Sequence, residues 1–142
     1  MKTLFKMDMK NYADSDTRIR RPSARAVIRV ADGRLALVYS RKHQYYKFPG
    51  GGIRDGEDHA EALAREVREE TGLRIRRDSI REYGSVLRLQ KSGRQEDTVF
   101  EQENFYYTCS AETAAGRQNL NAYEKESGFE LQYVHAREAA AV

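Results

Sequence analysis

The sequence predicts a mixed α/β domain, and three observations support this class. Short runs rich in β-branched and aromatic residues lie on both sides of one long amphipathic segment. That segment, which ends at Thr71, repeats its apolar residues with the spacing of an α-helix. The chain has 142 residues, the length of about one domain. We therefore expect residues 1–142 to form a single domain in which strands and helices pack as layers.

Three candidate strands precede the helix, at residues 3–7, 24–30 and 35–39. The polar stretch 10–23 has no periodicity and is predicted to be a loop. Asp32 and Gly33 join the second and third strands, and this dipeptide is favoured in tight hairpin turns. Pro49 then ends the extended segment before three glycines, which let the backbone turn sharply and approach a ligand closely.

The chain after the helix alternates apolar-aromatic runs with polar connections. These segments are predicted as strands at residues 80–90, 99–109 and 129–134, loops at 91–97 and 112–126, and a helix at 136–142. Strands on both sides of a central helix are typical of a sheet that is covered by helices.

Composition narrows the class of protein. No run of 18 apolar residues and no basic-then-apolar leader is visible, so we expect a soluble, cytoplasmic protein without a membrane span. The single cysteine, Cys109, excludes a disulfide within the chain and fits a reducing compartment. A net charge of +3 is below that of a dedicated nucleic-acid binder but suits a protein that handles phosphates. Arg18, Arg20 and Arg21 could meet phosphate or form a solvated basic loop.

The long helix carries an unusual set of carboxylates. It is predicted to run from Gly56 or Glu57 to Thr71, with Gly72 as its C-terminal stop. Its core-facing stripe consists of Ala60, Leu63, Ala64 and Val67. Glu66, Glu69 and Glu70 are expected together on the flank of that stripe. Because three neighbouring carboxylates repel one another, they imply a hard cation such as Mg²⁺ or Mn²⁺.

A simpler interpretation of these carboxylates is a solvent-exposed helix face with surface ion pairs. Glu57, Glu61 and the three flank carboxylates would then pair with Arg65 and Arg68. The glycine run before the helix and the complete spacing of the motif favour the functional interpretation. Arg65 lies four residues before Glu69 and is placed to hold its carboxylate.

The segment from Gly51 to Leu73, GGIRDGEDHAEALAREVREETGL, resembles the signature motif of the Nudix hydrolase family, the Nudix box. All nine fixed positions of the motif are filled, at Gly51, Glu57, Arg65, Glu66, Val67, Glu69, Glu70, Gly72 and Leu73. The resemblance implies an α/β/α sandwich with a mixed sheet. It also implies metal-dependent hydrolysis of a nucleoside diphosphate linked to another group, X. The products are a nucleoside monophosphate and phosphorylated X.

The resemblance implies roles for individual residues. Arg65 would pair with Glu57, and Glu66, Glu69 and Glu70 would bind the metal. Glu66 matches the glutamate that often deprotonates the attacking water, although some family members place this base in a loop. The carbonyl of Gly50 or Gly51 would add an oxygen ligand. A carboxylate outside the box would complete the set, either Glu101 or Glu103, of which Glu103 is preferred.

Substrate contacts are expected around the glycine turn. Tyr45, Tyr46 and Phe48 could stack on a nucleobase, although core packing is an alternative for each. Arg25 or Arg88 could hold a phosphate. The three histidines are scattered along the chain and are expected at the surface.

The substrate itself stays open. Some Nudix subfamilies carry a marker about fifteen to seventeen residues after the box, where this chain has residues 88–90 and no proline. Nucleoside triphosphates, RNA 5′ ends, sugar nucleotides and non-nucleotide diphosphates all remain candidates, as does a homodimer. The alternative function is a nucleotide-sensing module that binds without hydrolysis. Diphosphate isomerisation is disfavoured because Cys109 lies outside the motif.

Overall fold

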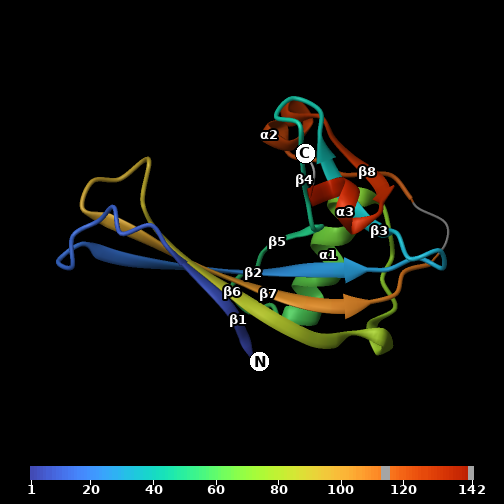
Figure 1. Ribbon diagram of the computed structural model, residues 1–142, viewed down its shortest axis with the longest axis horizontal. Helices are drawn as coiled ribbons and strands as arrows, with labels where there is room; N and C mark the ends of the chain where they lie inside the picture. The colour runs from blue at the N-terminus through green and yellow to red at the C-terminus, as the bar shows by residue number, and fades with distance from the viewer. Residues whose placement is uncertain (113–115, 141–142) are drawn as a thin grey trace.

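The computed structural model describes residues 1–112 and 116–140, which form two β-sheets and three α-helices (Figure 1). The larger sheet has the strand order β1-β6-β7-β2-β5 and the smaller sheet the order β4-β3-β8. The strands of the larger sheet are β1 (Thr3–Asp8), β2 (Thr17–Ile28), β5 (Gly50–Gly52), β6 (Arg81–Lys91) and β7 (Thr98–Cys109). Those of the smaller sheet are β3 (Leu35–Ser40), β4 (Tyr45–Lys47) and β8 (Phe129–Val134). The helices are α1 (His59–Thr71), α2 (Ala122–Ser127) and α3 (Ala136–Ala140), with a 3-10 turn at Arg77–Ser79.

The larger sheet is mixed, as predicted. Strand β1 runs parallel to β6, and β2 runs parallel to β7. The pairs β2–β5 and β6–β7 are antiparallel. This combination of a mixed sheet with packed helices confirms the α/β class.

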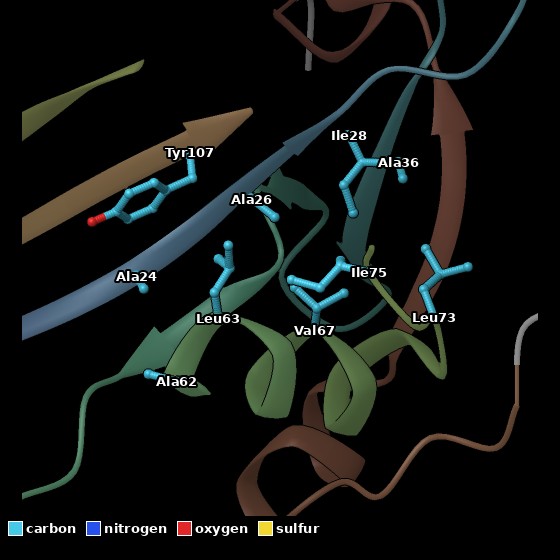
Figure 2. Packing of buried hydrophobic residues seen from close by; sticks show 10 residues of the cluster. All are labelled: Ala24, Ala26, Ile28, Ala36, Ala62, Leu63, Val67, Leu73, Ile75 and Tyr107. Carbon is cyan, nitrogen blue, oxygen red and sulfur yellow. The ribbon is translucent and has the colours of Figure 1, made fainter. Parts of the chain in front are cut away.

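Helix α1 covers one face of the larger sheet. Leu63 and Val67 are fully buried and pack against the short side chains of Ala24 and Ala26 on β2, which allow a close approach (Figure 2). The Asp58 side chain caps the N-terminus by accepting a hydrogen bond from the backbone N–H of Glu61 at 2.8 Å. Gly72 ends the helix with a left-handed φ of 78°.

The buried face of α1 is rotated from the predicted stripe. Ala62 and Glu70 are fully buried, whereas Ala60 and Ala64 are only half-buried. Leu63 and Val67 occupy the core as expected. The rotation brings the last box carboxylate into the interior.

A second cluster lies on the other face. Ala139 of α3 packs on Leu35 and Leu37 of β3, together with Val27 of β2. Helices α1 and α3 therefore lie on opposite sides of the sheets, which matches the sandwich that the sequence led us to expect.

The predicted loop at residues 10–23 is wrong for its second half. Residues 17–23 belong to β2, which pairs with β7 in register from Thr17 opposite Thr98 to Ile28 opposite Cys109. The outer part of β2 is largely exposed on both faces, so it lacks the apolar alternation that marks a strand. Its pairing with β7 defines it instead.

Two other expectations need correction. The turn at Gly33 is present, with φ of 88°, but β2 and β3 lie in different sheets and are joined beside the turn by an isolated bridge between Arg29 and Leu35. The segment 112–126 is not entirely loop, because α2 begins in it. A reciprocal capping box between Asn121 and Glu124 starts that helix. Helix α3 is described to Ala140, and residues 141–142 of its prediction lie outside the described residues.

The long strands extend past the helices as a β-arm (Figure 1). We define the β-arm as β1 together with residues 17–22, 86–91 and 98–103. It carries β1 at the open edge of the sheet. In the described part of the chain, no helix combines the length and the apolar composition needed to cross a bilayer.

Candidate functional site

Arg65 is the centre of the charged cluster on α1. Its Nε donates to Glu57 Oε2 at 2.6 Å and its Nη2 to Glu57 Oε1 at 2.8 Å. Its Nη1 donates to Glu66 Oε1 at 2.9 Å and to Glu69 Oε2 at 3.4 Å. The Nη2 group also reaches the carbonyl of Gly52 at 3.0 Å. One guanidinium therefore ties the glycine turn to three carboxylates, including the two expected partners, Glu57 and Glu69.

The ion pair between Arg65 and Glu57 shifts the pKa values of both groups. The bidentate Arg65 guanidinium lowers the pKa of Glu57 to about 2, and the same bond raises the pKa of Arg65. Three carboxylates around one guanidinium leave a formal charge of −2. The cluster therefore retains an excess of negative charge that a cation would neutralise.

Gly51 lies directly against the carboxylate of Glu66. A Cβ atom built at Gly51 would come within 2.6 Å of both Cδ and Oε2 of Glu66. The neighbouring Gly50 has φ of 147°, and a Cβ there would collide with the backbone carbonyl of Ala24. Each glycine is thus required for a different reason, Gly50 by the backbone and Gly51 by the carboxylate.

Glu70 differs from the other box carboxylates in burial and in hydrogen-bond partners. It is fully buried, and its Oε2 accepts from Lys47 Nζ at 2.5 Å while its Oε1 accepts from the Gly50 backbone N–H at 2.7 Å. Burial raises the pKa of Glu70, and the Lys47 charge opposes that shift. Of the three carboxylates expected on one flank, Glu66 and Glu69 bond to Arg65, whereas Glu70 bonds to Lys47 and Gly50 and anchors β4 and β5 to the helix.

The oxygen atoms around Gly51 are suitable for a hard divalent cation. Among the hydrogen bonds of the described residues, none uses Oε2 of Glu66 or Oε1 of Glu69. In the same part of the chain, no three acidic, histidine or cysteine side chains converge as a ready-made cage. Arg65 and Lys47 occupy the space among the carboxylates. Cation binding would therefore use the free oxygens of Glu66 and Glu69 and loosen their bonds to Arg65.

The expected substrate residues near the turn have structural contacts. Arg25 Nη1 donates to the carbonyls of Phe48 at 3.3 Å and Gly50 at 3.1 Å, so it braces the turn. Tyr46 is half-buried and donates to Gln132 at 3.1 Å. Phe48 packs edge-on against Tyr106, with ring centroids 5.6 Å apart. Phe48 also lines a cavity of about 460 Å³ on the side of the sheet away from α1.

A larger cavity, of about 880 Å³, opens beside the carboxylates. Arg65 and Glu69 line it on α1. Four further arginines share its wall, namely Arg68, Arg74, Arg77 and Arg117. None of these four takes part in an ion pair among the described residues. This basic wall was not predicted from the sequence, although the arginine-rich run 74–77 directly after the box was a visible signal.

The remaining candidates lie on the β-arm or at its base. Glu101 and Glu103 are in ion-pair range of Arg20, at 3.4 Å each. Among the hydrogen bonds and ion pairs of the described residues, none joins Glu103 to α1. Arg88 projects from the opposite face of the sheet, where it lines a small pocket.

Two histidines, His59 and His135, are half-buried and not fully at the surface as expected. His59 is half-buried, with Nδ1 2.6 Å from Tyr107 Oη and its ring 4.6 Å from that of Phe105. It joins the first turn of α1 to β7. His43 is exposed, as expected, and His135 is half-buried.

Comparisons with known proteins agree with the fold. A family model of the NUDIX domain matches residues 19–141. A protein described as a nudix hydrolase family member from Chromobacterium violaceum is 30% identical, with a TM-score of 0.53; the match covers 87% of this chain and 66% of that protein. A NUDIX hydrolase from Nitrosomonas europaea is 20% identical, with a TM-score of 0.60 and coverage of 87% and 77%. A MutT NUDIX hydrolase from Burkholderia pseudomallei is 20% identical, with a TM-score of 0.57 and coverage of 82% and 83%. No curated protein sequence matches the chain significantly.

Proposed function

The chain belongs to the Nudix family of hydrolases, and we propose that it cleaves the pyrophosphate bond of a nucleoside diphosphate linked to another group, X. The products would be a nucleoside monophosphate and phosphorylated X. The observation that carries this proposal is the carboxylate cluster that Arg65 holds against the glycine turn. A substrate of this kind bears several negative charges, which must be offset before a nucleophile can approach.

A divalent cation, Mg²⁺ or Mn²⁺, is part of the proposal. Glu66 and Glu69 would hold it through their free oxygens, with a carbonyl of Gly50 or Gly51 beside them. Glu70 would join them only after release from Lys47, and Glu103 only after release from Arg20. When bound, such a cation neutralises substrate phosphates and makes a bound water more acidic.

Glu66 is our candidate for the general base. Its Oε1 accepts a hydrogen bond from Arg65 at 2.9 Å and its Oε2 faces Gly51, so when Oε2 holds the cation and the Arg65 bond loosens, Oε1 would be the proton acceptor. The bidentate bond from Arg65 to Glu57 keeps the guanidinium in place. In this arrangement Arg65 and Glu57 position the base, and Glu66 accepts the proton.

The two cavities open on opposite faces of the sheet and offer different chemistry, so they are alternative places for a substrate group. The arginine wall beside Glu69 offers positive charge to the phosphates. The cavity at Phe48, lined also by Val27, Tyr83 and Thr108, offers an apolar surface with polar edges to a nucleobase. Arg25 would act through the turn that it braces, and Tyr46, on β4 just before Phe48, would support that ring.

We further propose that residues 1–142 act as one Nudix domain in the cytoplasm on small-molecule substrates. The net charge of +3 gives no support for a dedicated nucleic-acid binder, although an RNA 5′ end stays among the candidates. A nucleotide-sensing module is the second candidate function. The observation in its favour is that Arg65 and Lys47 already neutralise much of the acidic cluster.

A homodimer through β1 completes the proposal. Five large apolar side chains between Met1 and Met9 are at least 41% exposed, namely Met1, Leu4, Phe5, Met7 and Met9. The backbone N–H of Met9 donates to the carbonyl of Leu89 at 2.9 Å. Because the backbone groups of successive residues in a strand point to alternate edges, those of Lys6 and Asp8 face the open edge. Antiparallel pairing of two copies about Met7 would place Lys6 opposite Asp8 of the second copy. Apolar contact and opposite charges therefore support a second copy as the occupant of this edge.

The decisive experiment is a phosphate-release screen with Mg²⁺ and, in parallel, excess chelator. The substrates would be nucleoside triphosphates, sugar nucleotides, non-nucleotide diphosphates and capped RNA, and a pyrophosphatase or phosphatase with excess Mg²⁺ would be added only after this enzyme has been removed. Hydrolysis with Mg²⁺ but not with chelator is expected. Saturable nucleotide binding without turnover would favour the sensing module, and full turnover in chelator would contradict the metal-dependent mechanism.

A further inference from the structure

The two faces of the β-arm carry different charged side chains. Arg18 and Arg20 of β2 project toward the α1 side of the sheet, where both lie within ion-pair range of Glu101, at 3.7 and 3.4 Å. Arg20 also reaches Glu103 at 3.4 Å. The carboxylates thus neutralise the arginines on this face.

The opposite face of the β-arm is cationic and has amides in place of acids. Arg21, Gln102 and Arg88 form one cross-strand row, because Gln102 of β7 is in register with Arg21 of β2 and Arg88 of β6. Successive side chains on a strand point to opposite faces, so Gln102 lies between Glu101 and Glu103 in sequence but faces away from both. Among the described residues, neither Arg21 nor Arg88 forms an ion pair.

These side chains enclose a small pocket. Arg21, Arg88, Gln90, Phe100 and Gln102 line a cavity of about 100 Å³. The guanidinium carbon of Arg21 lies 5.1 Å from the Phe100 ring centroid, so the aromatic ring supports one wall. All polar groups of the lining are donors or amides, and none is a carboxylate.

Arg88 provides the observation that points to a ligand. Its Nε is buried, and it is the single buried side-chain nitrogen or oxygen without a hydrogen-bond partner among the described residues. An unsatisfied buried donor is costly, and a donor on a charged group more so. An anion in the pocket would offset the charge of both arginines, and a small rotation of the Arg88 side chain would let it accept that hydrogen bond.

We propose that the Arg21–Gln102–Arg88 row is a binding site for a phosphoryl group, on the face of the sheet opposite the carboxylates of α1. Two guanidinium groups match a doubly charged phosphate in charge and in their paired N–H geometry. The side-chain amides of Gln90 and Gln102 supply further donors. The phosphate comes either from the distal part of a long substrate or from a free phosphate ion. This site does not depend on the proposed hydrolysis.

The test uses inorganic phosphate as the probe and NMR of the arginine Nε–H groups as the readout. Phosphate should shift the Arg88 and Arg21 Nε–H signals saturably, while chloride at matched ionic strength should not. Arg88→Gln should weaken the response of Arg21 about tenfold or more, because a charge-assisted hydrogen bond is lost. Arg20→Gln is the matched control, because Arg20 lies on the same strand as Arg21, β2, but on its opposite face. This change should leave the response of Arg21 unchanged. No turnover is required, so failure of the hydrolase proposal would not affect this result.

A second measurement distinguishes the two sources of phosphate. If the ligand is part of a long substrate, Arg88→Gln should raise KM for long substrates but not for short ones, with kcat unchanged. If Arg88→Gln and wild type have equal KM values for long substrates as well as for short ones, the site is assigned to a free phosphate ion. Nε–H signals that do not respond to phosphate, or that respond equally to chloride, would overturn the proposal.

Discussion

Gly51 and Glu66 are in direct contact across the turn that precedes α1, with a built Cβ at Gly51 only 2.6 Å from the Glu66 carboxylate carbon. Gly51 does not have a positive φ angle. The constraint at this position is therefore the Glu66 carboxylate and not backbone strain. The glycine of the box thereby determines where the proposed base can sit. The turn and the helix form one unit of the site.

Substitutions along the glycine run should separate these effects. Gly51→Ala would displace the Glu66 side chain, so we expect activity to fall by about 100-fold with only a small change in melting temperature. Gly50→Ala should lower the melting temperature strongly, because its Cβ would meet the Ala24 backbone and its φ is 147°. Gly52→Ala is the control, since its Cβ would have no atom within 4 Å. Wild-type kinetics in Gly51→Ala would show that the contact with Glu66 has no functional role.

Glu66→Gln tests the proposed base. The amide keeps the size of the side chain but cannot accept a proton as readily, so kcat should fall by roughly 100- to 10,000-fold. The fold should persist because Leu63 and Val67 keep the core contacts of α1, which circular dichroism and thermal unfolding can check. Glu138→Gln, an exposed carboxylate on α3, is the control. A Glu66→Gln enzyme within tenfold of wild type would place the base elsewhere.

The buried pair of Lys47 and Glu70 should contribute more to stability than a surface pair. Lys47→Met would leave the Glu70 carboxylate buried without a counter-charge, and we expect a loss of about 3 kcal/mol in the free energy of unfolding. The matched control is Lys42→Met, which removes an exposed pair with Glu126 and should cost less than about 1 kcal/mol. Urea unfolding measures both. Equal losses in the two variants would contradict a special role for burial.

The box helix was largely predictable, whereas its rotation was not. The apolar spacing of Leu63 and Val67 and the stop at Gly72 were enough to place α1 in the fold. The burial of Glu70 depends on Lys47, 23 residues earlier in the chain, and no local pattern links the two. Sequence spacing gives the relative angles of side chains on a helix, but the neighbouring strands decide which angle faces the core.

The outer part of β2 shows a second limit. A basic loop was predicted at Arg18, Arg20 and Arg21 because neither face of this segment is apolar. Its strand character comes from pairing with β7, 81 residues away in sequence (Thr17 with Thr98). The same alternation that was missed is what places Arg20 among acids and Arg21 among amides. Long-range pairing therefore determined both the fold of this segment and its chemistry.

The Glu57–Arg65 pair should make stability depend on pH in the acidic range. The pKa of Glu57 is lowered from 4.5 to about 2, so its stabilising effect is complete above pH 4.5 and is lost as the pH falls toward 2. The unfolding free energy of wild type should therefore exceed that of Glu57→Gln near neutral pH, and the difference should shrink between pH 4.5 and 2. Urea titrations across this range provide the measurement. Glu126→Gln, from a surface pair with Lys42, should show a smaller difference that added salt abolishes. A difference for Glu57→Gln that is constant with pH would refute the assignment.

Charge reversal at β1 tests the proposed homodimer. In the antiparallel pairing about Met7, Lys6→Glu would place two acidic side chains opposite each other at two symmetric positions. We expect the dimer dissociation constant to rise by roughly tenfold, as measured by sedimentation velocity across a concentration series. Adding Asp8→Lys to Lys6→Glu should restore the opposite charges and the dimer, while Phe5→Glu should weaken it further through lost apolar contact. Tyr123→Glu, on α2, is the exposed control. A wild-type chain that stays monomeric at high concentration, or a dimer insensitive to all three β1 changes, would exclude this edge as the interface.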